Sequence, residues 1–286
     1  MEKNIYNIWF SSLDIENKVK LEILKKYNTK EIYGSDLVEL SEMIGEKNAI
    51  KILNCKNLSE AEQHLKIMKE NNIKLISVRD YKYPEKLKFI QDNPAFLYVR
   101  GNEDILDDDS VGIVGCRYAT NEGKKIARYI GKELTDRNIN VISGLAIGID
   151  KYAHLGALDS DIGKTIAVLG CGVSDDDIYP YQNKKVFERI LEKGGAIVSE
   201  YCIGSKPEKE HFPKRNRIIS GLSDKIIVVE AKIRSGSLIT ANWGLEQGKD
   251  IFAVPGNIFN KNSIGTNNLI KDGAFLFSDI NDLFYL

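Results

Sequence analysis

The segment from Val111 to Asp150 contains two short apolar runs, and each run ends in a loop of small residues. The first run stops at Gly115, and the second starts at Ile139 and stops at Ser143, with a helix-like pattern between them. Apolar runs of this length on either side of one helix are typical of two buried parallel strands in a βαβ unit. Ligands bind beyond the carboxyl ends of such strands, where loop amides and helix N-termini face them. Both loops are therefore candidate anion-binding sites.

The same alternation of apolar run and helical pattern continues along the rest of the chain. It predicts an α/β fold, an extended Rossmann-like, doubly wound and mostly parallel sheet that occupies residues 71–286. Two further strands are expected before it, at 73–78 and 94–99. The core strands are expected at 111–115, 139–143, 165–169, 195–199, 225–230, 250–254 and 274–277, and the helices at 121–137, 149–159, 182–193, 214–221, 237–247 and 264–271.

Residues 1–70 are predicted to form a separate small helical domain. Helices are expected at 13–27, 35–44, 47–53 and 59–70, the last with a capping box made by Ser59 and Glu62. Helices this short are stable only when they pack together. The segment is either a plain bundle, which its nearly balanced charge favours, or a helix-hairpin-helix-like module that touches a nucleic-acid backbone.

Composition limits the possible partners and cofactors. The net charge is −1 and 43% of residues are hydrophobic, so any anion site must be a local concentration of basic residues and amides. The four cysteines lack C-x-x-C spacing and the three histidines are scattered, so we expect neither disulfides, nor a metal site, nor a cofactor. We find no signal-peptide pattern and no apolar run of ~18 residues. The expected location is cytoplasmic, without membrane contact.

Basic and small residues follow several of the predicted strands. Gly115 and Arg117 combine an open backbone with a guanidinium fork, although a plain turn with a surface arginine has the same pattern. The loop 143–148 places Ser143, Gly144 and Gly148 where uncovered amides would form an anion-binding nest. In the loop 178–184, Lys184 could meet a phosphate, while Tyr179 and Tyr181 either stack on a base or pack in the core. His154, one turn from Leu158, is expected to have a core role.

The densest basic cluster spans residues 206–217. An aromatic ring beside several cations at a helix start combines base stacking with neutralisation of a nucleic-acid backbone, and a solvated helix start is the alternative. Its candidate contacts are Phe212, Lys214, Arg215, Asn216 and Arg217. A third small-residue loop, Ser235-Gly236-Ser237, opens the next helix with Ser237 as the expected N-cap. We identify no catalytic constellation, so the site is predicted to bind and not to catalyse.

Together these motifs resemble the DNA-processing protein A family, also called DprA or Smf, over roughly residues 73–280. The resemblance implies an extended Rossmann fold, with the N-terminal helices similar to a sterile-alpha-motif-like domain. It also implies a non-catalytic protein that binds and protects incoming single-stranded DNA and helps to load RecA recombinase in natural transformation. The motifs are Gly115-x-Arg117, Ser143-Gly-Leu-Ala-x-Gly-Ile-Asp150, Tyr179-Pro180-x-x-Asn183, Phe212-Pro213-x-Arg215-Asn216-Arg217, Glu230-Ala231, Ser235-Gly-Ser-Leu-Ile-Thr240 and Val254-Pro255-Gly256-Asn257.

Three departures from the family pattern qualify this resemblance. Cys116 stands where the family usually has serine or threonine, and Ile147 stands where a basic residue is frequent. We also expect no C-terminal winged helix in this chain. An alternative is a related nucleoside-monophosphate phosphoribohydrolase of the LOG, lysine-decarboxylase-like group, but its P-G-G-x-G-T loop is replaced here by residues 235–240. A nucleotide-sensing domain without DNA contact is the third reading.

The C-terminal segment predicts an assembly surface. Thr266 is expected to cap a short helix that presents Leu269 and Ile270, followed by an apolar strand at 274–277 near the sheet edge. An uncovered edge is an association hazard, and a compact apolar patch there suits a twofold partner. The family resemblance likewise implies a homodimer through the C-terminal part of the Rossmann domain. The alternative is that these residues cover the monomer's own sheet.

Overall fold

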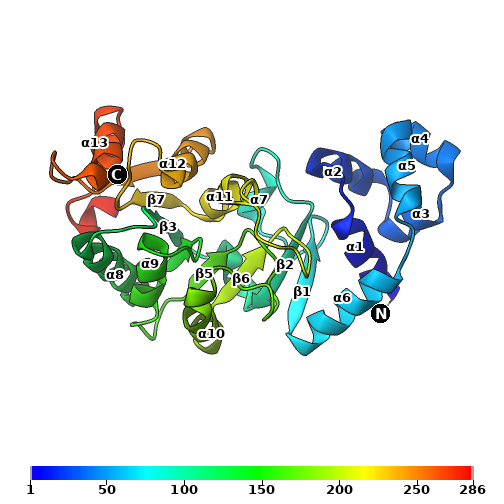
Figure 1. The fold of residues 1–286 in the computed structure, drawn as a ribbon, viewed down its shortest axis with the longest axis horizontal. Coiled ribbons are helices and arrows are strands. Elements are labelled where there is room, and N and C mark those ends of the chain that lie inside the picture. Colours follow the sequence, from blue (N-terminus) through cyan, green and yellow to red (C-terminus); the bar gives the residue numbers. More distant parts are fainter. Residues whose placement is uncertain (1, 285–286) are drawn as a thin grey trace.

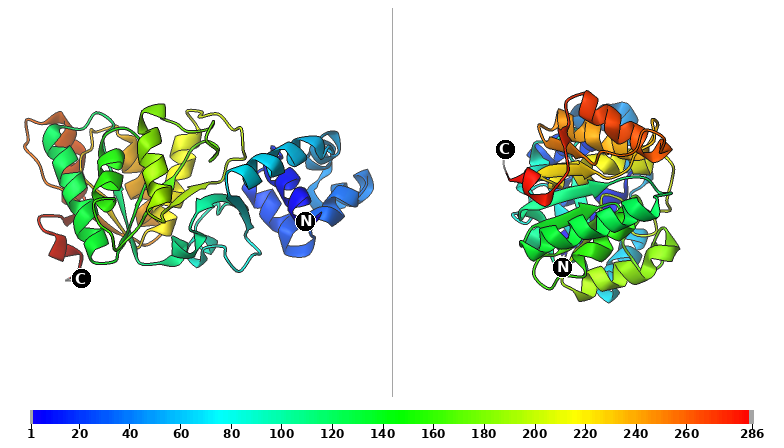
Figure 2. Two further views of the ribbon diagram at one scale, coloured as in Figure 1. Left: turned by 90° about the horizontal axis from the view of Figure 1, so that it is seen from below. Right: turned by 90° about the vertical axis from the view of Figure 1, so that its left-hand side faces the viewer.

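The computed structural model describes residues 2–284, with side chains from residue 5 onward. A group of helices stands at one end of an elongated molecule, and a nine-stranded sheet with helices on both faces forms the rest (Figures 1 and 2). The strands are β1 (Ile73–Ser77), β2 (Phe96–Gly101), β3 (Ser110–Val114), β4 (Asn140–Ser143), β5 (Thr165–Val168), β6 (Ala196–Ser199), β7 (Lys225–Val228), β8 (Asp250–Ala253) and β9 (Phe275–Leu276). The α-helices are α1 (Glu2–Ser12), α2 (Asn17–Lys26), α3 (Thr29–Gly34), α4 (Leu37–Ile44), α5 (Glu46–Asn54), α6 (Ser59–Glu70), α7 (Glu85–Lys88), α8 (Asn121–Asp136), α9 (Ile149–Ala157), α10 (Lys184–Glu192), α11 (His211–Leu222), α12 (Gly236–Glu246) and α13 (Ile264–Lys271).

The sheet has the strand order β1-β2-β6-β5-β4-β3-β7-β8-β9. The two ladders that involve β2 are antiparallel and all the others are parallel, which confirms the predicted mostly parallel sheet. The chain starts its parallel part at β3, proceeds outward to β6, and then returns to place β7 on the other side of β3. In an open α/β sheet such a reversal leaves a crevice beyond the carboxyl ends of the two strands, which is where ligands bind.

Alternate side chains of the strands fill two apolar layers. Val111, Ile113 and Val141 lie in a buried cluster with Ala127 and Ile130 of α8. The other face of the same sheet is covered by α11, α12 and α7, through a second buried cluster. Because both faces are covered, the strands read as continuous apolar runs, which is why their positions could be predicted within two residues.

The N-terminal helices share a core with the sheet. The ring of Phe10 on α1 packs edge-on against Phe96 on β2, with 6.1 Å between centroids. Next to it, the hydroxyls of Ser11 and Tyr98 share a 2.6 Å hydrogen bond. Phe10 is fully buried, and burial of a phenylalanine stabilises a fold by about 2 kcal/mol. The helical part is thus held to the sheet by apolar and polar contacts alike.

The helix boundaries in this part differ from the prediction. The segment 13–27 is not one helix, because the chain leaves α1 at Ser12 and re-enters helix only at Asn17. The helix expected at 35–44 is present as α4, which starts two residues later than predicted, whereas α3 was not predicted. Capping boxes begin these two helices, at Asn28 with Glu31 and at Asp36 with Glu39. The predicted box at the start of α6 is absent, because Leu58 occupies the N-cap position.

One short element was not predicted, and two further local predictions are wrong. Residues 103–107 form a 3₁₀ helix that buries Ile105 and Leu106. The N-cap of α12 is Ser235 and not Ser237, because the helix starts at Gly236, one residue before the predicted start. Thr266 does not cap α13; it is buried inside that helix and its hydroxyl donates to the carbonyl of Ser263.

Candidate functional site

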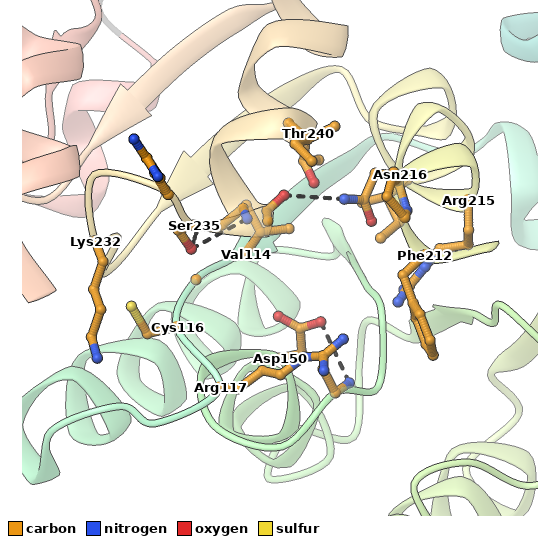
Figure 3. A pocket seen from close by; sticks show the side chains of 18 of the residues that line it. Val114, Cys116, Arg117, Asp150, Phe212, Arg215, Asn216, Lys232, Ser235 and Thr240 are labelled. Carbon is orange, nitrogen blue, oxygen red and sulfur yellow. Dashed lines mark hydrogen bonds between the residues drawn. The ribbon is translucent and has the colours of Figure 1, made fainter. Parts of the chain in front are cut away.

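A pocket of about 620 Å³ opens at the crevice between β3 and β7 (Figure 3). Its walls come from the loop after β3, the loop after β7, the first turns of α11 and the start of α12. Of the predicted contacts, eight line it: Gly115, Arg117, Phe212, Arg215, Asn216, Ser235, Gly236 and Ser237. Segments that are more than 100 residues apart in the sequence are therefore brought together where the strand order reverses.

The lining is strongly basic although the chain as a whole is not. It contains five cationic side chains against the carboxylate of Asp150, which is 7% exposed. Clustered cations in a recess raise the local concentration of anions. The pocket is thus suited to an anionic ligand, and the cations are Arg117, Lys209, Arg215, Lys232 and Arg234.

The ring of Phe212 lies between two of these cations. The guanidinium carbons of Arg117 and Arg215 are 5.2 and 5.9 Å from its centroid, and the ring of Tyr179 is 5.9 Å away. Tyr179 is 43% exposed. Aromatic rings beside guanidinium groups form stacking surfaces that accept any nucleobase.

Arg215 reaches the pocket from a buried position. Its side chain is 4% exposed, and Nη1 donates a 2.7 Å hydrogen bond to the carbonyl of Val168 at the end of β5. The guanidinium lies directly on the backbone of Gly144, where a Cβ would stand 1.8 Å from Nη1. Burial lowers the pKa of Arg215, but an arginine keeps its proton in proteins. Nε is buried and has no hydrogen-bond partner among the described residues.

The loop after β4 is not the open nest that was predicted. The Asp150 carboxylate accepts hydrogen bonds from the amides of Gly144 and Ala146, at 3.2 and 3.4 Å. An internal anion therefore takes the place predicted for a ligand. Ser143 also faces inward, because it is fully buried and its hydroxyl donates to the carbonyl of Ile113.

Gly148 serves close packing between two loops. Its φ is +85°, and a Cβ there would stand 2.2 Å from the carbonyl oxygen of Cys116. No side chain fits in that space, so glycine lets the loop after β4 pack on the loop after β3. Ser143, Gly144 and Gly148 thus shape the pocket wall from behind and do not line it.

One carboxylate connects three loops around the pocket. Glu230, which follows β7, accepts from the amide and the hydroxyl of Thr120 and from the side-chain amide of Asn262. The Thr120 hydroxyl also caps α8 by accepting from the amide of Gly123. The loops after β3 and β7 and the segment before α13 are therefore tied to one another.

A second set of bonds orients the α11–α12 side. The side-chain amide of Asn216 donates a 3.2 Å hydrogen bond to the carbonyl of Gly236, and the hydroxyl of Ser235 accepts from the amide of Ser237. These bonds hold the start of α12 against α11. Figure 3 shows Asn216, Arg215 and Phe212 on one side of the pocket, with Arg117 and Asp150 below and Lys232 opposite.

Three further predicted contacts also lie outside the pocket. Lys184 is half-buried and sits over the ring of Tyr181, and Lys214 is exposed on the outer side of α11. Arg217 is 1% exposed, and its guanidinium forms two hydrogen bonds of 2.6 and 2.8 Å with the carboxylate of Glu200. We therefore assign Arg217 a structural role, because a side chain that is buried and paired in this way cannot reach a phosphate.

The sequence prediction missed Lys209, Lys232, Arg234 and the internal role of Asp150. Lys232 and Arg234 carried a usable signal, because they follow a predicted strand directly. His154 was predicted correctly as a core residue: it is buried, and its Nδ1 is 2.7 Å from the hydroxyl of Thr165. Burial lowers the pKa of His154 to about 3, so it is neutral.

Residues 2–284 contain neither a cluster of metal-binding side chains nor a helix that could cross a membrane. No group of three or more His, Cys, Asp or Glu side chains in this range is arranged to hold a metal ion. Within the same range, no helix combines the length and the apolar character that a membrane crossing requires.

Comparison with known proteins identifies the family. The model for "DNA recombination-mediator protein A" matches residues 74–286. The chain belongs to this family. Protein Smf of Synechocystis is 40% identical over 246 residues, which are 85% of this chain but 61% of that protein. The chain thus spans less than two thirds of the length of this relative.

Two solved structures of the family resemble the chain. DNA processing protein A of Streptococcus pneumoniae superposes with a TM-score of 0.83 at 34% identity, covering 99% of this chain and 96% of the other. DNA processing protein A of Helicobacter pylori, whose structure was described for its single-stranded DNA binding mode, gives a TM-score of 0.65 at 31% identity, covering 73% and 94%. The chain therefore has the fold of the DNA processing protein A structures.

Proposed function

We propose that this chain binds single-stranded DNA in the pocket between β3 and β7. The observation that carries the proposal is the half-buried ring of Phe212 near both Arg117 and Arg215, in a recess with five cations. Cations neutralise phosphates whatever the sequence, and an aromatic face stacks on any base. The single-stranded DNA binding described for the Helicobacter pylori relative supports the proposal.

In the cell, we propose that the protein is a non-catalytic recombination mediator. It protects incoming single strands in the cytoplasm and helps to load RecA recombinase during natural transformation. Membership of the DNA recombination-mediator protein A family supports this role.

Fluorescence anisotropy with a labelled oligothymidylate tests the binding mode. We expect the single strand to bind more tightly than a blunt duplex of equal length, with little dependence on base sequence. The logarithm of the binding constant should fall with the logarithm of salt concentration by ~0.7 per phosphate contact. Equal affinity for single strand and duplex would overturn the proposal.

Incubation with nucleoside monophosphates tests the alternative hydrolase reading. Asp150 is the acidic side chain in the lining, and its carboxylate is bonded to two loop amides. We expect no release of free base, and release at a steady rate would make the chain an enzyme of the nucleotide group.

We propose further that the chain forms a homodimer through its C-terminal part. β9 is the last strand of the sheet, with Phe275 and Leu276 41% and 48% exposed, and Leu269 and Ile270 are half-buried on the neighbouring α13. An apolar sheet edge of this kind suits a twofold partner. Light scattering should give twice the chain mass of 32.2 kDa, and Ile270→Glu should give the monomer. An intact dimer after this change would place the interface elsewhere.

A further inference from the structure

A second recess, which we call the junction groove, lies where the N-terminal helices meet the sheet. Its volume is about 810 Å³, and it is lined by α2 on one side and by the segments after β1 and after α7 on the other. Its lining residues are Lys18, Leu21, Glu22, Leu24, Lys25, Val78, Arg79, Lys88, Gln91, Asp92 and Asn93. The groove is separate from the pocket between β3 and β7, because the two share no lining residue.

The charge of the junction groove favours an anion. Four basic side chains face two acidic ones; neither acid is free, and two of the cations, Lys25 and Lys88, are paired with Glu22 and Glu85. Glu22 pairs with Lys25 at 2.6 Å, and Asp92 pairs with the buried Arg217 at 3.4 Å. Lys18 and Arg79 are exposed. Arg79 gives one N–H to the carbonyl of Tyr27, so the rest of its guanidinium fork can bind a phosphate.

Helix α11 is the wall between the pocket and the junction groove. Phe212, Arg215 and Asn216 line the pocket. Arg217, on the other side of the helix, donates a 2.8 Å hydrogen bond to the backbone of Asp92 in the groove. Lys214 is exposed on the same helix, and its carbonyl accepts a 2.9 Å hydrogen bond from Nη1 of Arg217. In Figure 1 the segment that carries α7 lies between α11 and α2.

The rim of the junction groove also carries an exposed ring. Phe89 stands between the lining residues Lys88 and Gln91 and is 87% exposed. A large apolar side chain at such exposure stabilises nothing in the described fold, and an aromatic beside cations is the usual surface for stacking bases.

We propose that the junction groove is a second contact site for the same DNA strand, which leaves the pocket, passes Lys214 on α11 and lays its phosphates along Lys18 and Arg79. This inference rests on the proposed function of the pocket. A single strand is favoured over an acidic peptide because the groove continues the pocket across one helix, whose width is about 10 Å. The rim ring also gives a base a stacking partner. The N-terminal helices are thereby assigned a direct part in DNA binding.

The test compares the full chain with the double variant Lys18→Glu/Arg79→Glu, using oligothymidylates of increasing length and two salt concentrations. A short oligonucleotide that fills only the pocket should bind both proteins alike. With longer strands, the wild type should gain affinity and the double variant should lose roughly ten-fold relative to it. The salt slope on long strands should fall by ~0.7 for each lost phosphate contact. Phe89→Ala should reduce affinity for long strands about five-fold without changing the salt slope.

The double variant Lys125→Glu/Lys185→Glu, on α8 and α10, is the matched control, because it makes the same change in net charge and both lysines are exposed and line neither recess. An equal loss in this variant would show an effect of net charge alone and would overturn the proposal. Wild-type affinity of the Lys18→Glu/Arg79→Glu variant for long strands would also overturn it, and would leave the groove to an acidic peptide or another occupant. Failure of the wild type to bind short strands would instead refute the proposed function of the pocket. An unchanged melting temperature of each variant confirms that the fold is intact.

Discussion

Two loops at the same edge of the sheet have similar sequences but differ in what their backbone faces: one surrounds a carboxylate of the protein itself, and the other borders an open pocket. The loop after β4 and the loop after β3 both consist of small residues that follow a buried strand. In the first, the carboxylate of Asp150 occupies the amides of Gly144 and Ala146. In the second, Gly115 and Arg117 face an open pocket. A small-residue loop thus indicates that amides are accessible, but a carboxylate four to six residues ahead can satisfy them internally.

Removal of the internal carboxylate should have the largest effect. Asp150→Ala leaves two amides without their acceptor and Arg215 without its nearest anion, so the free energy of unfolding should fall by about 3 kcal/mol. Urea denaturation measures this. Asp150→Asn keeps one acceptor oxygen and should lose less. An unchanged midpoint for the alanine variant would show that the loop after β4 does not depend on its own anion.

The buried histidine behind the filled loop should make stability depend on pH. Burial holds the pKa of His154 at about 3, against 6.5 for a free imidazole, so between these values the unfolded chain binds more protons. Its contribution is complete above pH 6.5 and is lost as the pH falls. The free energy of unfolding should therefore decrease by about 2 kcal/mol from pH 7 to pH 5. Denaturation at both pH values, with His154→Gln as the control, should show the decrease in the wild type and not in the variant.

On the open side, a change of one cation should affect binding and leave stability alone. Arg117 is exposed, and its guanidinium lies 5.2 Å from the Phe212 ring. Arg117→Ala should weaken single-strand binding by about 1.5 kcal/mol. The free energy of unfolding should change by less than about 0.5 kcal/mol. Arg215→Ala is expected to reduce both quantities, because Arg215 also holds the end of β5 through Val168. Equal stability losses in the two variants would contradict this distinction.

The smallest predicted effect is a difference in DNA affinity between variants of two lysines, the exposed Lys232 and the half-buried Lys184. Lys232 lines the pocket, whereas Lys184 lies outside it over the ring of Tyr181. A solvated charge contributes little, so Lys232→Ala should weaken DNA binding about two-fold. Lys184→Ala should leave the affinity unchanged. Anisotropy titrations at low salt resolve the two, and the reverse order would move the strand toward the loop after β5.

The positions of strands and helices could be predicted from the sequence, but the order of the strands could not. Runs such as Val111–Val114 are apolar throughout because helices cover both faces, and that pattern is local. The pairing of β3 with β7 depends on contacts between residues more than 100 positions apart. The doubly wound sheet was predicted, but the two strands that flank its reversal were not, and neither was the place of Lys232 and Arg234 in the pocket.

The basic cluster on α11 shows the same limit at one helix. Arg215 and Arg217 are two residues apart, so they point about 200° away from each other around the helix axis. From the sequence alone, both arginines were predicted to contact nucleic acid. The structure places Arg215 at the pocket and Arg217 in an ion pair with Glu200 on the other side. The elements packed around a helix decide which of its sides faces a ligand. The arrangement of the elements around α11 could not be predicted from the sequence.

The bonds of Glu230 have a thermodynamic consequence for ligand capture. Since this carboxylate ties Thr120 and Asn262 to the end of β7, the loops that carry the pocket have little freedom to lose when a strand arrives. The ordering entropy of binding then falls almost entirely on the nucleic acid, which is flexible when single-stranded. Calorimetry should therefore find that the unfavourable entropy of binding grows with the number of bound nucleotides, while the contribution of the protein to that entropy stays nearly constant.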